Sequence, residues 1–193
     1  MNKNSYNSVL IIGMGLIGSS IARVIKEKKT AKKIYAIDNN KTIIKITKDL
    51  GLVDDIYNSL DNISFQFDLI FICTPLSSYI KIFKQLNNFI KEPTLITDVG
   101  STKVSVINDF KSTIDNNKIS FLPAHPIAGL EKSGPEHGFA KLFDNRYCII
   151  TPINSEDIFI EEISNIWKSF GMIIETMDAK RHDRVLAMTS HIP

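Results

Sequence analysis

The sequence lacks long apolar runs and carries almost no net charge. No run of 18 or more residues is apolar throughout, so no segment is expected to span a membrane. The 23 Lys and Arg residues nearly balance the 21 Asp and Glu residues, so no strong field for nucleic acid or an acidic membrane surface is implied. Residues 1–8 are polar, and no small-residue cleavage site is present, which argues against a secretory signal.

Cysteine is also scarce. The chain has two cysteines, Cys73 and Cys148, and they form no C-x-x-C pair. Two isolated cysteines supply no disulfide framework and fit a reducing compartment, so we expect a cytoplasmic protein. No group of His, Cys and carboxylate residues has the spacing of a metal site, and no metal is expected. The length of 193 residues suits one domain with a sizeable core and part of another.

A glycine-rich hexad follows the first apolar run. Residues 9–12 read V-L-I-I, typical of a strand buried on both faces, and residues 13–18 read G-M-G-L-I-G. In such a turn Gly13 permits a tight bend and Gly15 lets a pyrophosphate approach the backbone. The last glycine, Gly18, lets the following helix pack closely against the strand. The hexad therefore predicts a dinucleotide site, although a turn that only joins strand to helix is the plainer alternative.

The residues around the hexad support this interpretation. A helix expected over residues 16–29 would direct the N–H groups of Leu16 and Ile17 at the phosphates. Asp38 closes a second strand, 20 residues after the last glycine, where a carboxylate can accept hydrogen bonds from ribose hydroxyls. A carboxylate there repels a 2′-phosphate, and two asparagines follow it rather than an arginine. We therefore expect NAD as the cofactor, with NADP less favoured.

Strand-like and helix-like stretches alternate along the whole chain. Beyond those already described, we expect strands at residues 33–37, 68–73, 94–97, 119–122, 146–151 and 172–176, and helices at 41–50, 76–90, 104–114 and 156–170. This alternation predicts an α/β fold with a doubly wound, mainly parallel Rossmann-type sheet.

The remaining stretches predict a long loop and a domain boundary. Residues 123–145 contain several Gly and Pro residues and are interpreted as a long functional loop. Residues 1–177 are expected to form the dinucleotide-binding domain. Residues 178–193 are expected to start a helical domain, with Asp178 as a cap. Because no capping pattern precedes residue 193, we expect the chain to be a piece of a longer protein.

Ligands of such sheets lie beyond the carboxyl ends of the strands, where three stretches of this sequence converge. The first stretch is Cys73-Thr74-Pro75, the second begins at Asp98 and the third contains His125. We expect Cys73, Thr74, Pro75 and Asp98 to line the cofactor site.

His125 is the histidine expected at a strand end beside the nicotinamide, so it is the candidate to accept a proton from a substrate hydroxyl. Ser101 would fix the tautomer of His125 by a hydrogen bond, and its alternative role is to cap the next helix. Lys103 is expected to be a solvated lysine in the first turn of that helix, with a functional role as the alternative. Glu131 is a candidate to contact a polar substrate, with a surface ion pair as the alternative. The pair at residues 182–183, His-Asp, is expected to cap or pack rather than to act in catalysis.

Several motifs occur together in a characteristic order: G-M-G-L-I-G-S-S, I-C-T-P, T-D-V-G-S-T-K, H-P-I-A-G-L-E-K-S-G and H-D-R-V-L-A-M-T-S-H-I-P. From about residue 9 to residue 193 the chain resembles prephenate dehydrogenase and the related cyclohexadienyl and arogenate dehydrogenases of tyrosine biosynthesis. The resemblance implies NAD-dependent oxidative decarboxylation of prephenate or arogenate. It implies that His125 hydrogen-bonds the ring hydroxyl and that Ser101 orients this histidine near the nicotinamide. It also implies that Glu131 lies at the mouth of the substrate site and that Ser190 lies near the substrate.

Two departures from the family pattern stand out. In that family the chain continues past this point into a helical domain that carries further substrate contacts and most of the dimer contact. A homodimer is therefore expected of the whole protein, and these 193 residues alone are expected to be inactive. Leu130 stands where relatives often have threonine.

Two other functions stay open. The first is a β-hydroxyacid-type dehydrogenase, for which no catalytic lysine is evident. The second is a non-catalytic dinucleotide-sensing module, which would need neither Ser101 nor His125.

Overall fold

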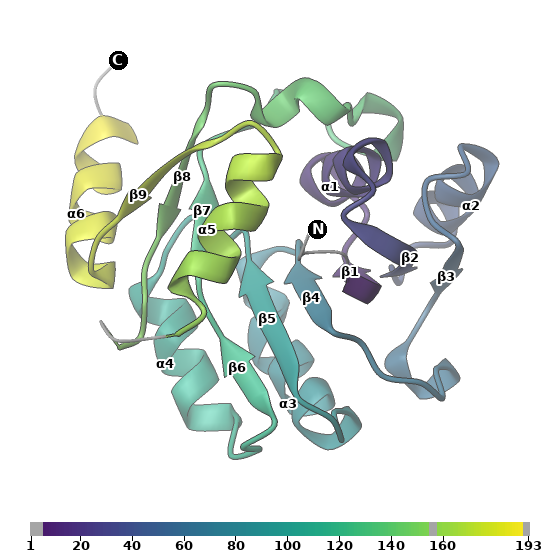
Figure 1. The fold of residues 1–193 in the computed structure, drawn as a ribbon, viewed down its shortest axis with the longest axis horizontal. Coiled ribbons are helices and arrows are strands. Elements are labelled where there is room, and N and C mark those ends of the chain that lie inside the picture. Colours follow the sequence, from purple (N-terminus) through teal and green to yellow (C-terminus); the bar gives the residue numbers. More distant parts are fainter. Residues whose placement is uncertain (1–5, 155–157, 191–193) are drawn as a thin grey trace.

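A six-stranded parallel sheet forms the centre of the fold in the computed structural model, which describes residues 6–154 and 158–190 (Figure 1). Its strands lie in the order β3-β2-β1-β4-β5-β6. Their bounds are β1 Tyr6–Ile12, β2 Ala31–Ile37, β3 Asp55–Tyr57, β4 Leu69–Ile72, β5 Thr94–Asp98 and β6 Ile119–Phe121. Because β1 pairs with both β2 and β4, the order of the strands reverses at β1. In folds of this type, ligands bind at the carboxyl ends of the strands beside such a reversal.

Helices cover both faces of this sheet (Figure 1). The helices are α1 Leu16–Lys28, α2 Lys41–Asp49, α3 Tyr79–Phe89, α4 Val104–Thr113, α5 Ile160–Ser169 and α6 Ala179–Ser190, with short 3₁₀ turns η1 Leu60–Asn62 and η2 Leu76–Ser78. Side chains alternate along β4, so Phe71 joins the core shared with α1 and α5, whereas Ile70 and Ile72 join the core shared with α3 and α4. The predicted doubly wound Rossmann-type α/β fold is confirmed.

A second, three-stranded sheet stands beside the first. It consists of β7 Ala124–Pro126, β8 Tyr147–Ile150 and β9 Ile173–Thr176, with β7 antiparallel and β9 parallel to β8. The expectation of one sheet, with a loop directly after β6, was therefore wrong in this region. Pro123 has no N–H to continue the ladder, so the chain leaves β6 and pairs with β8 instead. An apolar run does not specify which sheet its strand will join.

The segment between β7 and β8 packs on α1. It contains the 3₁₀ turns η3 Pro135–His137 and η4 Ala140–Phe143. Phe139 N donates to Ser20 Oγ at 3.1 Å, and a side chain on Gly138 would come within 2.2 Å of Ser19 Oγ. Small residues on both sides thus let the segment cross α1 closely, so the predicted long loop is in fact an ordered cover for this helix.

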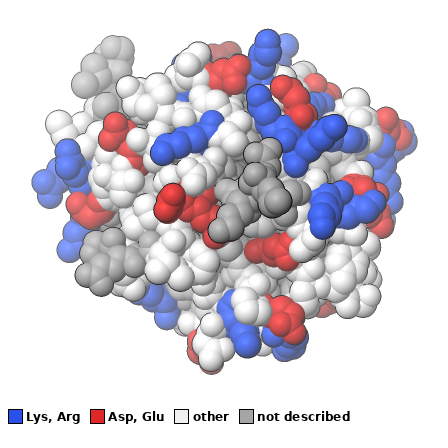
Figure 2. Space-filling view, viewed as in Figure 1, with Lys and Arg blue, Asp and Glu red and all other residues white. Residues whose placement is uncertain are grey.

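Charges of both signs are interspersed on the face seen in Figure 2. Among the described residues, no helix is long and apolar enough to cross a membrane. The same part of the chain contains no cluster of three or more His, Cys, Asp and Glu side chains that could hold a metal ion.

The three glycines of the hexad occupy distinct environments. Gly13 has φ +97°, and a Cβ there would lie 2.8 Å from the carbonyl oxygen of Cys73. A Cβ on Gly18 would lie 2.0 Å from the carbonyl oxygen of Gly13, whereas a Cβ on Gly15 would meet nothing within 4 Å. These distances confirm the tight turn at Gly13 and the close helix packing at Gly18. They leave the space in front of Gly15 open, as a phosphate would need.

The Gly18→Ala variant is expected to lose about 3 kcal/mol of unfolding free energy, because backbone rather than a flexible side chain opposes the new methyl group. Gly15→Ala is the matched control and should stay within about 0.5 kcal/mol of the parent, since its methyl group enters open space. Urea unfolding followed by circular dichroism measures both changes. Equal stability of the two variants would contradict the close contact at Gly18.

Candidate functional site

The glycine-rich turn and Asp38 form one end of the candidate site. Gly13 N donates to Ile37 O at 2.8 Å, which brings the end of β2 against the turn. Asp38 Oδ2 then accepts from Met14 N at 2.9 Å, and its Oδ1 accepts from Asn40 N at 2.9 Å. The carboxylate is half-buried and fixed in orientation beside the turn.

Helix α1 begins at this turn without a side-chain cap, because its N-cap residue is Gly15. Its first N–H groups, including those of Leu16 and Ile17, therefore have no capping side chain. Open space at Gly15, a helix N-terminus and a fixed carboxylate together fit a pyrophosphate and an adjoining ribose.

The segment after β4 forms the next part of the site. The backbone of Cys73 lies against Gly13, and Ser78 Oγ donates to Thr74 Oγ1 at 2.8 Å. Pro75 is exposed at the surface beyond the strand. Burial, together with the charge of Asp98, raises the pKa of the Cys73 thiol, so this side chain stays protonated and is no nucleophile. Of the predicted residues, Cys73 and Thr74 are thus brought next to the glycine turn.

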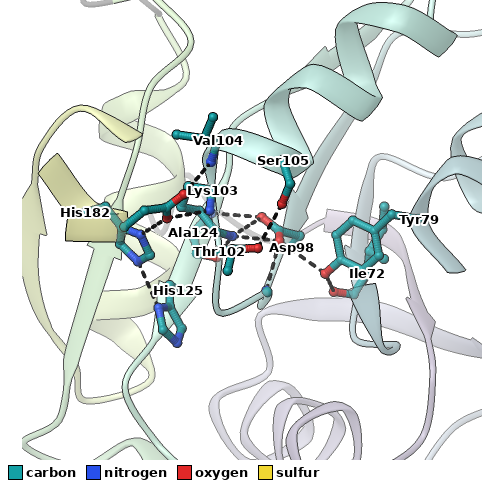
Figure 3. Close-up of polar contacts among 12 residues, drawn as sticks. Ile72, Tyr79, Asp98, Thr102, Lys103, Val104, Ser105, Ala124, His125 and His182 are labelled. Atoms are coloured by element: carbon teal, nitrogen blue, oxygen red, sulfur yellow. Dashed lines mark hydrogen bonds and ion pairs between the residues drawn. The ribbon is translucent and has the colours of Figure 1, made fainter. Parts of the chain in front are cut away.

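Asp98, at the end of β5, is fully buried and surrounded by donors (Figure 3). Lys103 Nζ lies 2.9 and 2.7 Å from its two carboxylate oxygens. Gly100 N donates at 2.9 Å, Ala124 N at 3.1 Å and Tyr79 Oη at 3.1 Å. Lys103 Nζ also donates to Ala124 O at 2.7 Å. Burial lowers the pKa of Lys103, and the neighbouring Asp98 opposes this shift.

These contacts correct two predictions. Lys103 is not a solvated lysine, because its side chain is 0% exposed. Asp98 does not present its carboxylate to a cofactor, because that side chain is also 0% exposed and protein donors occupy both oxygens. A strand-end aspartate gives the same sequence pattern whether its partners come from a ligand or from the protein itself. The pair instead ties the end of β5 to the start of β7.

His125 lies on β7 and is half-buried. Its Nδ1 is 2.9 Å from Nε2 of His182, which is 0% exposed. The Nδ1 of His182 is in turn 2.7 Å from Asp183 Oδ1. Asp183 also accepts from Lys103 N at 2.8 Å and from Val104 N at 3.0 Å, so it caps α4 (Figure 3). Two imidazoles and one carboxylate thus form a continuous row from α6 to β7.

The other predicted residues lie outside this row. Ser101 is exposed and, among the residues that the structure describes, forms no hydrogen bond with His125. Its alternative role as a cap of α4 is taken by Asp183. Glu131 is exposed in the segment after β7. Ser190 is the last residue of α6, and its side chain lies outside the described residues.

The sequence predicted a capping or packing role for His182 and Asp183, and Asp183 does cap α4, but the contact of His182 with His125 was not predicted. That contact spans 57 positions along the chain. The available signal was the carboxylate of Asp183 directly after a histidine, and that pattern equally fits a helix cap.

The environment keeps both imidazoles of the row neutral. Burial, followed by the positive charge of Lys103 and the proximity of His182, lowers the pKa of His125 to about 3, although Asp183 opposes this shift. Burial also lowers the pKa of His182, although Asp183 opposes this shift. A neutral, half-buried imidazole at a strand end can accept a hydrogen bond or a proton from a hydroxyl group.

Comparison with known proteins identifies the family of this chain. A family model described as "Prephenate dehydrogenase, nucleotide-binding domain" matches residues 21–176. The chain belongs to the prephenate dehydrogenase family. The match runs from within α1 to the end of β9, and the glycine turn at residues 13–18 lies directly before it.

Relatives in this family are similar over nearly the whole chain. A cyclohexadienyl dehydrogenase of Zymomonas mobilis is 34% identical over 97% of this chain and 64% of its own length. A prephenate dehydrogenase of Lactococcus lactis is 32% identical over 96% of this chain and 50% of its own length. This chain therefore spans about half to two thirds of the length of these relatives.

A solved structure is similar as well. The crystal structure of prephenate dehydrogenase from A. aeolicus in complex with hydroxyphenyl propionate and NAD+ has a TM-score of 0.85 and 30% identity. The match covers 93% of this chain and 62% of that one.

The buried ion pair can be tested by removing its cation. Lys103→Met should lower the unfolding free energy by about 3–5 kcal/mol, because it leaves the carboxylate of Asp98 buried without a counter-charge. The double variant Lys103→Met/Asp98→Asn is the matched control and should recover most of this loss, because no buried charge remains. Urea unfolding measures both. A single variant as stable as the parent would contradict the pairing.

The low pKa of His125 predicts a pH dependence of stability. Between its unfolded pKa of about 6.5 and its folded pKa of about 3, the unfolded chain binds a proton at this residue that the folded chain does not. Stability should therefore fall as the pH falls through this range. In His125→Gln this contribution is absent, so the urea midpoint should drop less between pH 7 and 5 than in the parent. An identical drop in both proteins would exclude the lowered pKa.

Proposed function

We propose that this chain binds NAD and that the whole protein catalyses the NAD-dependent oxidative decarboxylation of prephenate or arogenate. The supporting observation is a chain of contacts that links the glycine turn to His125 along the carboxyl ends of the strands. The glycine turn touches Cys73 after β4, and Val99 N donates to Ile72 O at 3.2 Å between β5 and β4. Asp98 then holds Ala124, the residue before His125. The proposed cofactor site and the proposed proton acceptor therefore share one edge.

NAD is the proposed cofactor for physical reasons. The N–H groups at the start of α1 would hold the pyrophosphate, and Asp38 would accept hydrogen bonds from the ribose hydroxyls. Asp38 and the asparagines that follow it offer no cation for a 2′-phosphate, which favours NAD over NADP. The structure of the A. aeolicus relative contains NAD+. Bound NAD would supply the acceptor for a hydride.

The proposed reaction needs one well-placed acceptor for a proton. The ring carbon that carries the hydroxyl group loses a hydride, and the hydroxyl proton moves to Nε2 of His125. The bond to the ring carboxylate breaks, carbon dioxide leaves, and the electrons of that bond complete an aromatic ring with a phenolate oxygen, which takes the proton back from Nε2 of His125. Aromatisation supplies the driving force, so the protein contributes mainly alignment and one hydrogen-bond acceptor.

Further residues and properties remain part of this proposal. Ser101 would assist His125 once ligands are bound, and Glu131 and Ser190 would contact the substrate. Residues 178–193 would begin a second, helical domain, and the whole protein would be a cytoplasmic homodimer. The support for these statements is the resemblance of the motifs to the family.

The full-length protein is expected to reduce NAD in the presence of prephenate or arogenate. His125→Asn should lower kcat by about 10²–10⁴, because the acceptor for the hydroxyl proton is lost, while the Kd for NAD stays unchanged. His137→Asn, a change in η3 on the cover of α1, is the control and should keep the parent rate. Absorbance of the reduced cofactor measures turnover with each substrate. Turnover equal to that of the parent would remove His125 from the mechanism, and NAD binding without turnover in the parent would indicate a non-catalytic module.

A further inference from the structure

The row of side chains from α6 to β7 is fixed at its far end. The carboxylate of Asp183 accepts from Lys103 N at 2.8 Å and from Val104 N at 3.0 Å, at the first turn of α4. These donors lower the pKa of Asp183, although burial opposes the shift. The carboxylate is therefore ionised and held in one orientation by the backbone of another helix.

An ionised carboxylate can only accept hydrogen bonds, and this fact determines where the protons of the row lie. The contact of 2.7 Å between Asp183 Oδ1 and His182 Nδ1 requires a proton on that nitrogen. Because His182 is buried and neutral, its Nε2 then carries a lone pair. The contact of 2.9 Å between this Nε2 and Nδ1 of His125 therefore requires a proton on Nδ1 of His125.

The remaining nitrogen of His125 is thereby defined. A neutral imidazole with a proton on Nδ1 has its lone pair on Nε2, which is the acceptor that the proposed reaction needs. In Figure 3 the ring of His125 extends away from His182. Besides Asp183, the charged group that acts on His125 is Lys103, and its ammonium is already bound to Asp98 and to Ala124 O. The thiol of Cys148, on the paired strand β8, stays protonated because burial raises its pKa.

We propose that His182 and Asp183 are positioning residues that hold His125 in the tautomer with Nδ1 protonated and Nε2 free. This inference rests on the proposed function, because it identifies the atom that accepts the hydroxyl proton. His182 and Asp183 belong to α6, whereas His125 belongs to β7 and the capped N–H groups belong to α4. The tautomer of His125 therefore depends on the docking of α6 against α4.

The tautomer can be read directly by NMR on this chain labelled with ¹⁵N-histidine. Two-bond ¹H–¹⁵N correlations at pH 7 should show His125 protonated on Nδ1 and unprotonated on Nε2, with His125→Gln used to assign its signals. This measurement needs no turnover and no variant of His182. A parent protein with the proton on Nε2 of His125 would overturn the inference, whether or not the proposed function holds.

Two variants of His182 test the cause. In His182→Phe the acceptor facing His125 is lost, so the His125 spectrum should move toward the tautomer with Nε2 protonated, which free histidine prefers in water. His182→Gln should restore the parent tautomer, because its amide oxygen can accept from His125 and its amide nitrogen can donate to Asp183. The same tautomer in all three proteins would contradict the role of His182.

Kinetics of the full-length protein add a second readout. His182→Phe should lower kcat at least about tenfold, since a base held in the wrong tautomer loses far more than this in a comparable catalytic triad. The Kd for NAD should be unchanged, and His182→Gln should recover most of the rate. If the parent shows the expected tautomer but no turnover, the proposed function fails while the positioning role stands. Loss of NAD affinity in both variants with unchanged kcat would contradict the positioning role.

Discussion

A buried lysine joins the two sheets of this fold. Lys103 Nζ donates to Asp98 at the end of β5 and to Ala124 O at the start of β7. Moving such a pair out of water costs several kcal/mol per ion, and a well-packed apolar pair would be at least as stable. The ion pair contributes directional hydrogen bonds, which fix where β7 begins in a way that an apolar contact would not. His125 follows Ala124 directly, so its position depends on this ion pair.

The backbone of Lys103 adds a second constraint. Its N–H donates to Asp183, which also contacts His182. One residue therefore fixes the strand that carries His125 through its side chain and the helix that carries His182 through its backbone. The cap that Asp183 provides also explains why α6 packs against α4, since the first turn of α4 would otherwise lack a cap.

Local patterns predicted the fold and one end of the candidate site. The apolar runs and the glycine hexad each depend on neighbours within a few residues, so the strands, the tight turn at Gly13 and the packing at Gly18 could be predicted. The burial of Lys103, the second sheet and the contact of His125 with His182 depend on partners far along the chain. A lysine after a strand end is solvated in most sequences. Only the arrangement of β5 and β7 in space supplies the acceptors, Asp98 and Ala124 O, that allow this ammonium to be buried.

The low pKa of His125 bears on the kind of catalysis that the site can support. An imidazole with a pKa of about 3 is a weak base, so strong basicity cannot be what this residue contributes. In the proposed reaction, aromatisation drives the loss of hydride and carbon dioxide, and the hydroxyl group needs a neutral acceptor in the right direction. Burial keeps the imidazole of His125 neutral but makes it a weaker base, and the contact with His182 fixes which nitrogen of His125 carries the lone pair. A fixed tautomer therefore matters more in this site than a pKa near 7.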